Sequence, residues 1–253
     1  MQKLKRSSIN MPHKKSQITL IILIAMVILF AFLGVYFLTI IVSPQRSLEI
    51  PFEKGAIEQY MTNCLKAEAE NALILMGKQG SFLEPEEYVT SDNYKISILL
   101  KSNASLIPRD SVVEEQLSSY IDEHMLSCLQ NFRDFEKQGW KVTYETPQTK
   151  ATLNKKDITF QQLFLISVQK DTAITFKEFT YTAPVRLSYV LEITKKIIDF
   201  SILESGYTDL TALAAESVNV TIMPYQGSVL YSIQDEQSRI MNEPYMFNFA
   251  IKP

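Results

Sequence analysis

Hydrophobic residues dominate one stretch of the chain, which Thr19 and Thr39 interrupt only mildly, and follow helical or strand spacing in the rest. Residues 18–42, ITLIILIAMVILFAFLGVYFLTIIV, include no charged side chain. A helix of this length rises roughly 37 Å, enough to cross a hydrocarbon core about 30 Å thick. The pattern therefore predicts a transmembrane helix over residues 18–42.

Two other interpretations of this stretch are a cleaved signal peptide and a buried core helix. A signal peptide has an apolar run of about 7–15 residues and small residues at its cleavage site. The run here is longer, and it exits as IVSPQRS. A core helix keeps a polar stripe, which residues 18–42 lack, so a membrane span is favoured over both.

The charges on either side of the apolar stretch predict its orientation. Residues 1–17 carry five basic side chains and no acidic one, whereas the charges of residues 43–55 balance. Because positive flanks stay in the cytoplasm, we expect a cytoplasmic tail (1–17), a stalk (43–55) and an extracytoplasmic domain (56–253). All 28 acidic residues but only 20 of the 25 basic residues follow the span, and the resulting net charge of −8 argues against a nucleic-acid partner.

Helical spacing recurs in two stretches after the stalk. The first predicts a helix from about Gly55 to Met76, ended by Gly77 and Gly80. In the second, Ser111 and Glu114 form an S-x-x-E capping box, which predicts that a helix begins at Ser111. The segments IEQYMTNCL (57–65) and IDEHMLSCL (121–129) match at their Ile, Met, Cys and Leu positions, so the two helices share a pattern.

The two cysteines, Cys64 and Cys128, occupy equivalent positions on the apolar faces of these helices. Cysteine pairs outside the cytoplasm are usually bridged, and packing of the two faces would bring the sulfur atoms within bonding distance. We therefore predict a disulfide between them, with two unpaired core cysteines as the alternative.

Alternation of apolar and polar residues replaces helical spacing after Gly139. It predicts a meander of three or four antiparallel strands over 140–182, followed by helices at 185–203 and about 208–215. Further strands are expected at 94–100, in a hairpin that turns at Gln226–Gly227, and at the apolar C-terminus. The order predicts an α+β fold: a transmembrane helix, then a domain with antiparallel sheet and three to four helices.

Few residues of the predicted domain suggest catalysis or cofactor binding. His124 is the only histidine after the span, and we interpret it as structural because it lies on an apolar helix face. Two acidic groups, Glu84–Glu87 and Asp235–Glu236, could bind calcium weakly or act as paired carboxylates. Neither has the spacing of a calcium loop, so we interpret both as solvated and assign no catalytic residue, metal ligand or cofactor.

Two segments fit the acceptor pattern for N-linked glycosylation. They are Asn103-Ala104-Ser105 and Asn219-Val220-Thr221. Asn103 lies in a predicted loop and Asn219 in a predicted strand, which favours Asn103 as the acceptor.

The segment KKSQITLIILIAMVIL resembles the start of archaeal type IV pilin-like precursors. That resemblance implies removal of a basic leader between Ser16 and Gln17 and packing of the apolar helix into a filament. Many pilins carry a glutamate early in the helix, whereas residues 18–42 contain no acid. The chain also resembles uncharacterised single-pass archaeal surface proteins, through its basic-Gln-apolar start and a Cys64–Leu65 helix that ends near Gln79–Gly80; this resemblance implies no activity.

We expect a single-pass cell-surface protein without enzymatic activity. It would contact membrane lipid through residues 18–42 and bind an envelope or cell-surface protein through residues 56–253. The alternatives are a pilin-like filament subunit, which would form homo-oligomers, and a hydrolase that uses paired carboxylates.

Overall fold

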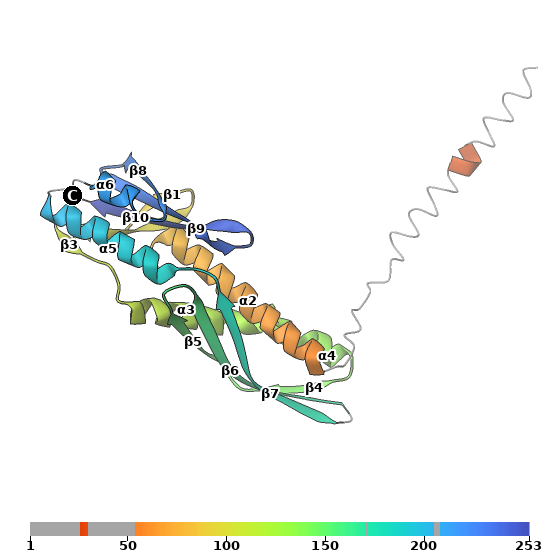
Figure 1. The fold of residues 1–253 in the computed structure, drawn as a ribbon. Coiled ribbons are helices and arrows are strands. Elements are labelled where there is room, and N and C mark those ends of the chain that lie inside the picture. The colour runs from red at the N-terminus through yellow and green to blue at the C-terminus, as the bar shows by residue number, and fades with distance from the viewer. Residues whose placement is uncertain (1–25, 30–53, 171, 205–207, 253) are drawn as a thin grey trace, which may run out of the picture. The chain divides into compact units, whose positions relative to one another are not determined.

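The computed structural model of the chain describes residues 26–29, 54–170, 172–204 and 208–252 (Figure 1). The chain divides into two compact units, Met1–Ile50 and Pro51–Pro253. In the first unit Met26–Leu29 are helical; the rest of the predicted span, the tail 1–17 and the stalk to residue 53 lie outside the described residues. Among the helices that the structure describes, none combines the length and apolarity that a membrane crossing requires.

The second unit is an α+β fold built on one long helix, α2 (Lys54–Gln79). One part of α2 contacts helix α3 (Asp110–Cys128) and strand β7 (Ala173–Ala183), and another part contacts strands β2 (Tyr94–Lys101) and β10 (Glu243–Lys252). Its buried side chains recur at the predicted helical spacing. They are Ile57, Met61, Cys64, Leu65, Ala69, Ala72, Leu73 and Met76.

The smaller sheet is the predicted antiparallel meander. It consists of β4 (Lys141–Tyr144), β5 (Gln148–Leu153), β6 (Ile158–Gln169) and β7. Strand β6 pairs with β7 along one edge and with both β5 and β4 along the other. Phe160, Phe164 and Ile166 of β6 are buried, whereas Leu163 and Leu165 face solvent. One face of this sheet therefore packs inward and the other is open.

The larger sheet has the strand order β1–β2–β10–β9–β8, with β3 paired to β2. Its remaining strands are β1 (Tyr88–Ser91), β3 (Ala104–Ser105), β8 (Asn219–Tyr225) and β9 (Ser228–Ile240). The predicted hairpin and the apolar C-terminal strand are confirmed as β8–β9 and β10. One pair, β2 with β10, is parallel, which the prediction of antiparallel sheet missed. Strand β1 was not predicted, because four residues are too few to show alternation.

The other helices are short except α5. They are α4 (Arg133–Lys137), α5 (Leu187–Leu203) and α6 (Leu210–Ala214), with a 3-10 turn η1 (Gln130–Phe132) before α4. Helix α5 lies along the larger sheet (Figure 1). It buries Val190, Ile193 and Ile197, which confirms the apolar stripe that predicted it.

The larger sheet is strongly curled. Strands β1 and β8 stand at opposite ends of its strand order, yet the Tyr225 hydroxyl donates to the Thr90 carbonyl at 2.8 Å. The two edges therefore meet. The curled face encloses a small core of Ile96, Ile98, Leu230 and Ala250, against which Val89 and Tyr225 pack.

Four hairpins of this sheet use the same two-residue turn. Both turn residues have positive φ at Asp92–Asn93, Ser102–Asn103, Gln226–Gly227 and Met241–Asn242. Type I′ turns require this backbone and favour Asn or Gly. The second turn residue is Asn or Gly in all four, so the turn predicted at Gln226–Gly227 is confirmed and the other three carry the same signal.

The last turn of α2 lies directly against the backbone of β10. A Cβ atom at Gly77 would stand 2.2 Å from the Met246 carbonyl oxygen, and one at Gly80 would stand 2.3 Å from that of Asn248. The prediction that Gly77 ends the helix was wrong, because the helix continues to Gln79. Gly77 allows the helix to approach the backbone of β10 closely. Of the two glycines, Gly80, with φ +73°, is the one that adopts the left-handed conformation after the helix.

The predicted capping box at the start of α3 is absent. The helix begins at Asp110 after the N-cap residue Arg109, which makes no side-chain cap. Glu114 turns instead toward the smaller sheet, where its Oε1 accepts a hydrogen bond from the Leu153 amide at 2.8 Å. The prediction failed because the glutamate has a partner outside its own helix.

Two further side chains of α3 continue this contact along β5. Ser118 Oγ accepts from the Ala151 amide at 2.9 Å, and Asp122 Oδ2 accepts from the Thr149 amide at 3.1 Å. Four helix residues rise about 6 Å and two strand residues about 6.8 Å, so the two repeats match. We call these three contacts the α3–β5 ladder; they occupy amides that the edge strand would otherwise leave unpaired.

Substitution of Asp122 tests the α3–β5 ladder, because this residue makes a second hydrogen bond to Thr149. Its Oδ1 accepts from the Thr149 hydroxyl at 2.6 Å. We expect Asp122→Ala to lower the free energy of unfolding by about 2 kcal/mol, since the half-buried amide and hydroxyl protons of Thr149 both lose their acceptor. Urea denaturation with the disulfide intact measures the change. Glu123→Ala, at the exposed neighbouring position, is the control and is expected to change stability little.

The amide variant Asp122→Asn separates the hydrogen bonds from the charge. Burial raises the pKa of Asp122, and the hydrogen bonds from Thr149 lower it without cancelling the effect of burial. When folding raises the pKa of a carboxyl group, its ionised form destabilises the folded protein at a pH above that pKa. An uncharged amide at the same position avoids this destabilisation. At neutral pH Asp122→Asn should therefore be close to the unchanged protein in stability; a loss as large as that of Asp122→Ala would contradict this account.

Candidate functional site

The structure brings together the two cysteines that the sequence pairs. Cys64 of α2 and Cys128, the last residue of α3, form a disulfide with an S–S distance of 2.08 Å and a Cα–Cα distance of 5.8 Å. Cys64 is 4% exposed. The prediction from compartment and helical register is confirmed, and the bond fixes α2 against α3.

His124 makes its contacts within its own helix. Its Nδ1 lies 2.8 Å from the Tyr120 carbonyl oxygen, and its ring stacks on that of Tyr120 at 4.0 Å. The residue is half-buried, and Met125 takes the core position beside it. The helix ends at Cys128, and Gln130, Asn131 and Phe132 just after it have left-handed φ.

The first acidic group does not form a site in the described part of the chain. Glu84, Glu86 and Glu87 are exposed, and Glu87 forms an ion pair with Lys101 at 2.8 Å. No group of three or more His, Cys, Asp or Glu side chains among the described residues is arranged to hold a metal ion.

The second acidic group is divided by the fold. Glu236 is exposed and accepts a hydrogen bond from Gln234, whereas Asp235 is 0% exposed. Asp235 Oδ2 accepts from Arg186 Nε at 3.0 Å, and its Oδ1 is bound by Arg186 Nη2. This bidentate pair joins β9 to the residue that precedes α5.

The surroundings of Asp235 hold it as a carboxylate. Burial alone raises its pKa, but hydrogen bonds from Arg186, the Ser238 hydroxyl and the Gln237 amide outweigh burial and lower the pKa below the usual range. The Arg186 amide also donates to Ser238 Oγ at 2.9 Å. The register of β9 against β10 shifts at this point, which places these groups around one carboxylate.

The same arginine begins a polar network that runs along α5. Its guanidinium lies 4.5 Å from the ring centre of Tyr189 and contacts the Ser217 hydroxyl at 3.3 Å. The Tyr189 hydroxyl donates to Glu216 Oε2 at 2.9 Å, and Lys196 Nζ donates to Glu216 Oε1 at 2.7 Å. We call this set, Arg186, Tyr189, Lys196, Glu216, Ser217 and Asp235, the α5 network.

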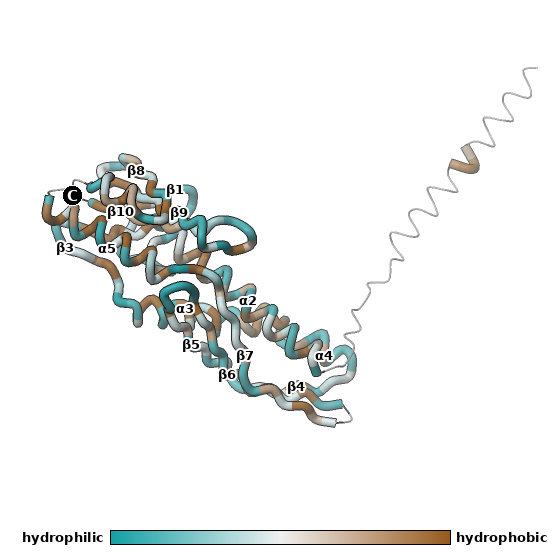
Figure 2. Tube along the Cα trace, viewed as in Figure 1, coloured by the Kyte–Doolittle hydropathy of each residue, from teal (hydrophilic) through white to brown (hydrophobic). Residues whose placement is uncertain are grey.

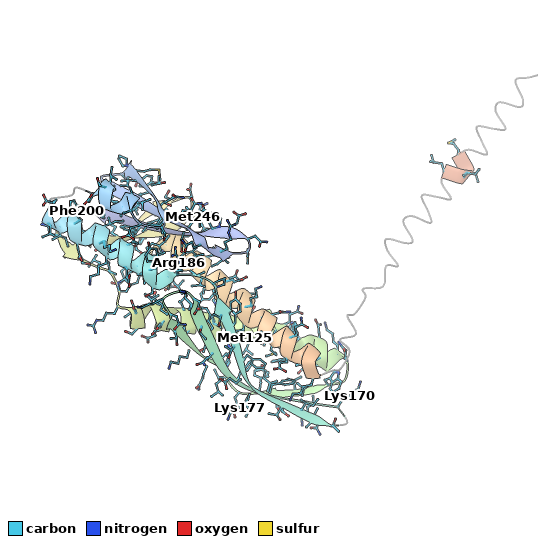
Figure 3. The ribbon with its side chains drawn as sticks, in the orientation of Figure 1. Met125, Lys170, Lys177, Arg186, Phe200 and Met246 are labelled. Carbon is cyan, nitrogen blue, oxygen red and sulfur yellow. A yellow bond between two sulfur atoms is a disulfide. The ribbon has the colours of Figure 1, made fainter. Side chains whose placement is uncertain are left out.

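Two members of the α5 network, Lys196 and Glu216, line a groove between α5 and α6. The groove encloses about 200 Å³. Its lining residues are Lys196, Ile197, Phe200, Thr208, Asp209, Ala212, Leu213 and Glu216. Ile197 and Leu213 are buried and Phe200 is half-buried, so the floor is apolar, while the charged residues stand at the rim. Figure 3 shows Phe200 toward the far end of α5 and Arg186 at its beginning.

The rim carboxylates of the groove both have partners. Asp209 Oδ1 accepts from the Ala212 amide at 3.0 Å and so caps α6. The hydrogen bond from Lys196, followed by that from Tyr189, lowers the pKa of Glu216. The rim thus carries two carboxylates and one lysine, Lys196, and this formal charge favours a cationic neighbour over a second anion.

Helix α6 is held by few contacts. A second hollow of about 360 Å³ lies on its other side and is lined in part by Leu210, Ala214 and Asn219. Leu213 is the one buried side chain of α6, and Leu210 is 65% exposed. Leu203, at the end of α5, is 78% exposed, so apolar surface continues beyond the groove.

One pattern in the sequence indicates that Asp235 needs a buried partner such as Arg186, and this pattern was missed. Tyr231, Ile233 and Asp235 alternate on the buried face of β9, and a carboxylate in such a position requires a buried partner. The polar character of the β9 segment that carries Asp235 is visible in Figure 2. The groove had no local signal, since its two walls come from separate helices.

Comparisons with protein-family models, curated proteins and solved structures found no match to this chain. The site is therefore interpreted from its own geometry and chemistry.

The buried pair gives a prediction about stability. Asp235→Ala should lower the free energy of unfolding by about 3 kcal/mol, because it leaves Arg186 without its partner. Glu236→Gln, at the exposed neighbouring position, should change it by less than about 0.5 kcal/mol. Chemical denaturation of the oxidised protein compares the two.

Substitutions at the same two positions test the pH dependence. Because the folded state lowers the pKa of Asp235, its contribution is complete above the pKa of the unfolded chain and is lost as the pH falls through the folded value. Stability of the unchanged protein should fall in acid, and Asp235→Asn should reduce the slope of that fall. Equal acid slopes for Asp235→Asn and Glu236→Gln would contradict the assignment.

Proposed function

We propose that the chain is a single-pass membrane protein whose second unit is an extracytoplasmic, non-enzymatic binding domain. The observation that carries this proposal is the Cys64–Cys128 disulfide behind an uncharged stretch of 25 residues. Disulfides persist in oxidising compartments, and the basic flank before residues 18–42 predicts a cytoplasmic N-terminus. Both features support a location of the second unit on the outer side of the membrane.

The groove between α5 and α6 is the proposed binding surface. Helix α2 begins at one end of the second unit, whereas α6 and the end of α5 lie at the other (Figure 1). Within the second unit the groove is therefore far from the beginning of α2. Its apolar floor and anionic rim fit an apolar side chain next to a basic group on an envelope or cell-surface protein.

The carboxylates of the groove favour binding over hydrolysis. A general acid needs a proton near neutral pH, which requires a raised pKa. Glu216 has a lowered pKa, and Asp209 caps a helix. The two acids that line the groove thus already have hydrogen-bond partners, which supports a non-enzymatic role.

Identification of the N-terminal peptide tests the anchor. We expect protein extracted from its native membrane to retain residues 1–42, and external protease on intact cells to digest the second unit but not the tail. Peptide maps with and without reduction should show the Cys64–Cys128 link. A chain that begins at Gln17 would favour the pilin-like filament subunit, and one that begins after residue 42 would exclude both.

A bulky residue in the groove tests the binding surface. Ala212 and Ala214 are both exposed on α6, but Ala212 lines the groove and Ala214 lines the hollow on the other side. We expect Ala212→Trp to abolish cross-linking of the full-length protein to envelope proteins on intact cells, and Ala214→Trp to preserve it. Equal cross-linking by both variants, with equal thermal stability, would rule out the groove.

A further inference from the structure

Asn219 occupies a position for which the fold offers no structural reason. It is the first residue of β8, a strand that pairs only with β9 among the described strands. Its side chain is exposed and makes no hydrogen bond in the described part of the chain. Asparagine is disfavoured in strands, so neither turn geometry nor pairing accounts for it. Thr221, two residues on, points to the same face of the strand and is also exposed.

The turn that contains Asn103 accounts for an asparagine at that position, but it does not account for Ser105, two positions later. Asn93, Asn103 and Asn242 all occupy the second position of a type I′ turn, with φ of 67°, 61° and 69°. Only Asn103 is followed by a hydroxyl residue at that distance, Ser105. Both Asn103 and Ser105 are exposed on the β2–β3 hairpin. The other two turns therefore serve as matched positions with the same backbone and no acceptor pattern.

We propose that Asn219 and Asn103 are N-glycosylated, an inference that rests on the proposed extracytoplasmic location of the second unit. The donor is an oligosaccharide linked through phosphate to a lipid. The side-chain nitrogen Nδ2 attacks the anomeric carbon, a C–N bond forms, the C–O bond to phosphate breaks, and one amide proton is lost as the lipid phosphate leaves. Each modified asparagine thus carries one oligosaccharide in place of one hydrogen.

A glycan at Asn219 has a physical consequence for the fold. Strand β8 meets β1 at Tyr225, the end far from Asn219, and a strand edge left open at its beginning would invite pairing with other strands. Asn219 also borders the hollow beside α6, opposite the proposed binding groove. The oligosaccharide would cover the beginning of this edge while leaving the groove open.

Mass spectrometry of the full-length protein from its own cells tests the proposal. The expected result is an intact mass two oligosaccharides above that of the polypeptide, with glycopeptides that contain Asn103 and Asn219. Thr221→Ala and Ser105→Ala should each remove one oligosaccharide, whereas Thr221→Ser and Ser105→Thr should retain both. Asn93→Gln should leave the mass of attached carbohydrate unchanged.

The outcomes separate this inference from the proposed function. A bare polypeptide mass, with the second unit open to external protease on intact cells, would overturn glycosylation and leave the anchored domain in place. An oligosaccharide that survives Thr221→Ala or Ser105→Ala would overturn the assignment of that asparagine. A second unit protected from external protease would overturn the topology and the glycosylation together.

Discussion

The connection between the two sheets depends on the packing of both against α2. The sheets share no strand among the described residues, so the helix must bury side chains against both. The Tyr181 hydroxyl of β7 donates to Glu70 at 2.8 Å, and the Tyr245 hydroxyl of β10 donates to the Leu73 carbonyl at 3.2 Å. These partners are three residues apart on α2, so one turn of the helix is held from both sides. Buried Ala69 and Ala72 leave room there for the approach of both sheets.

Four different features protect the edges of the sheets. The α3–β5 ladder occupies amides along one edge of the smaller sheet, and α2 lies against β7 at the other. In the larger sheet the curl brings β1 and β8 together, where Tyr225 bonds to Thr90. Pro224 in β8 also lacks an amide to offer another strand. The fold thus limits the unpaired backbone that would promote aggregation.

Local periodicity explains which parts of the fold could be predicted. The long helices, the meander, the β8–β9 hairpin and the Cys64–Cys128 pair all follow from spacing within short segments. The misassigned residues are those whose partners are distant in the sequence. Gly77 resembles a helix-ending glycine but faces Met246, and Glu114 resembles a capping residue but binds Leu153. Their local signals are the same in either role, so only the tertiary contact decides between them.

The candidate site was less predictable than the fold for the same reason. The parallel pairing of β2 with β10 joins residues just over 150 positions apart, and the groove combines α5 with a short helix that follows it. Asp235 alone carried a usable signal, as an acid on the buried face of an alternating strand. Its partner Arg186 could not be identified from the sequence, because the partner is set by where β7 leads into α5.

The two walls of the groove differ in how firmly they are held. Glu216 is fixed by Tyr189 and Lys196, and the adjacent Ser217 contacts Arg186, which is tied to buried Asp235. These residues at the rim are held in place before any partner binds, which reduces the entropy lost on association. The α6 wall has one buried side chain and a hollow behind it. An ordered, charged rim beside a loosely held α6 suits recognition of one basic, apolar feature among differing neighbours, which is what a surface domain of the proposed kind requires.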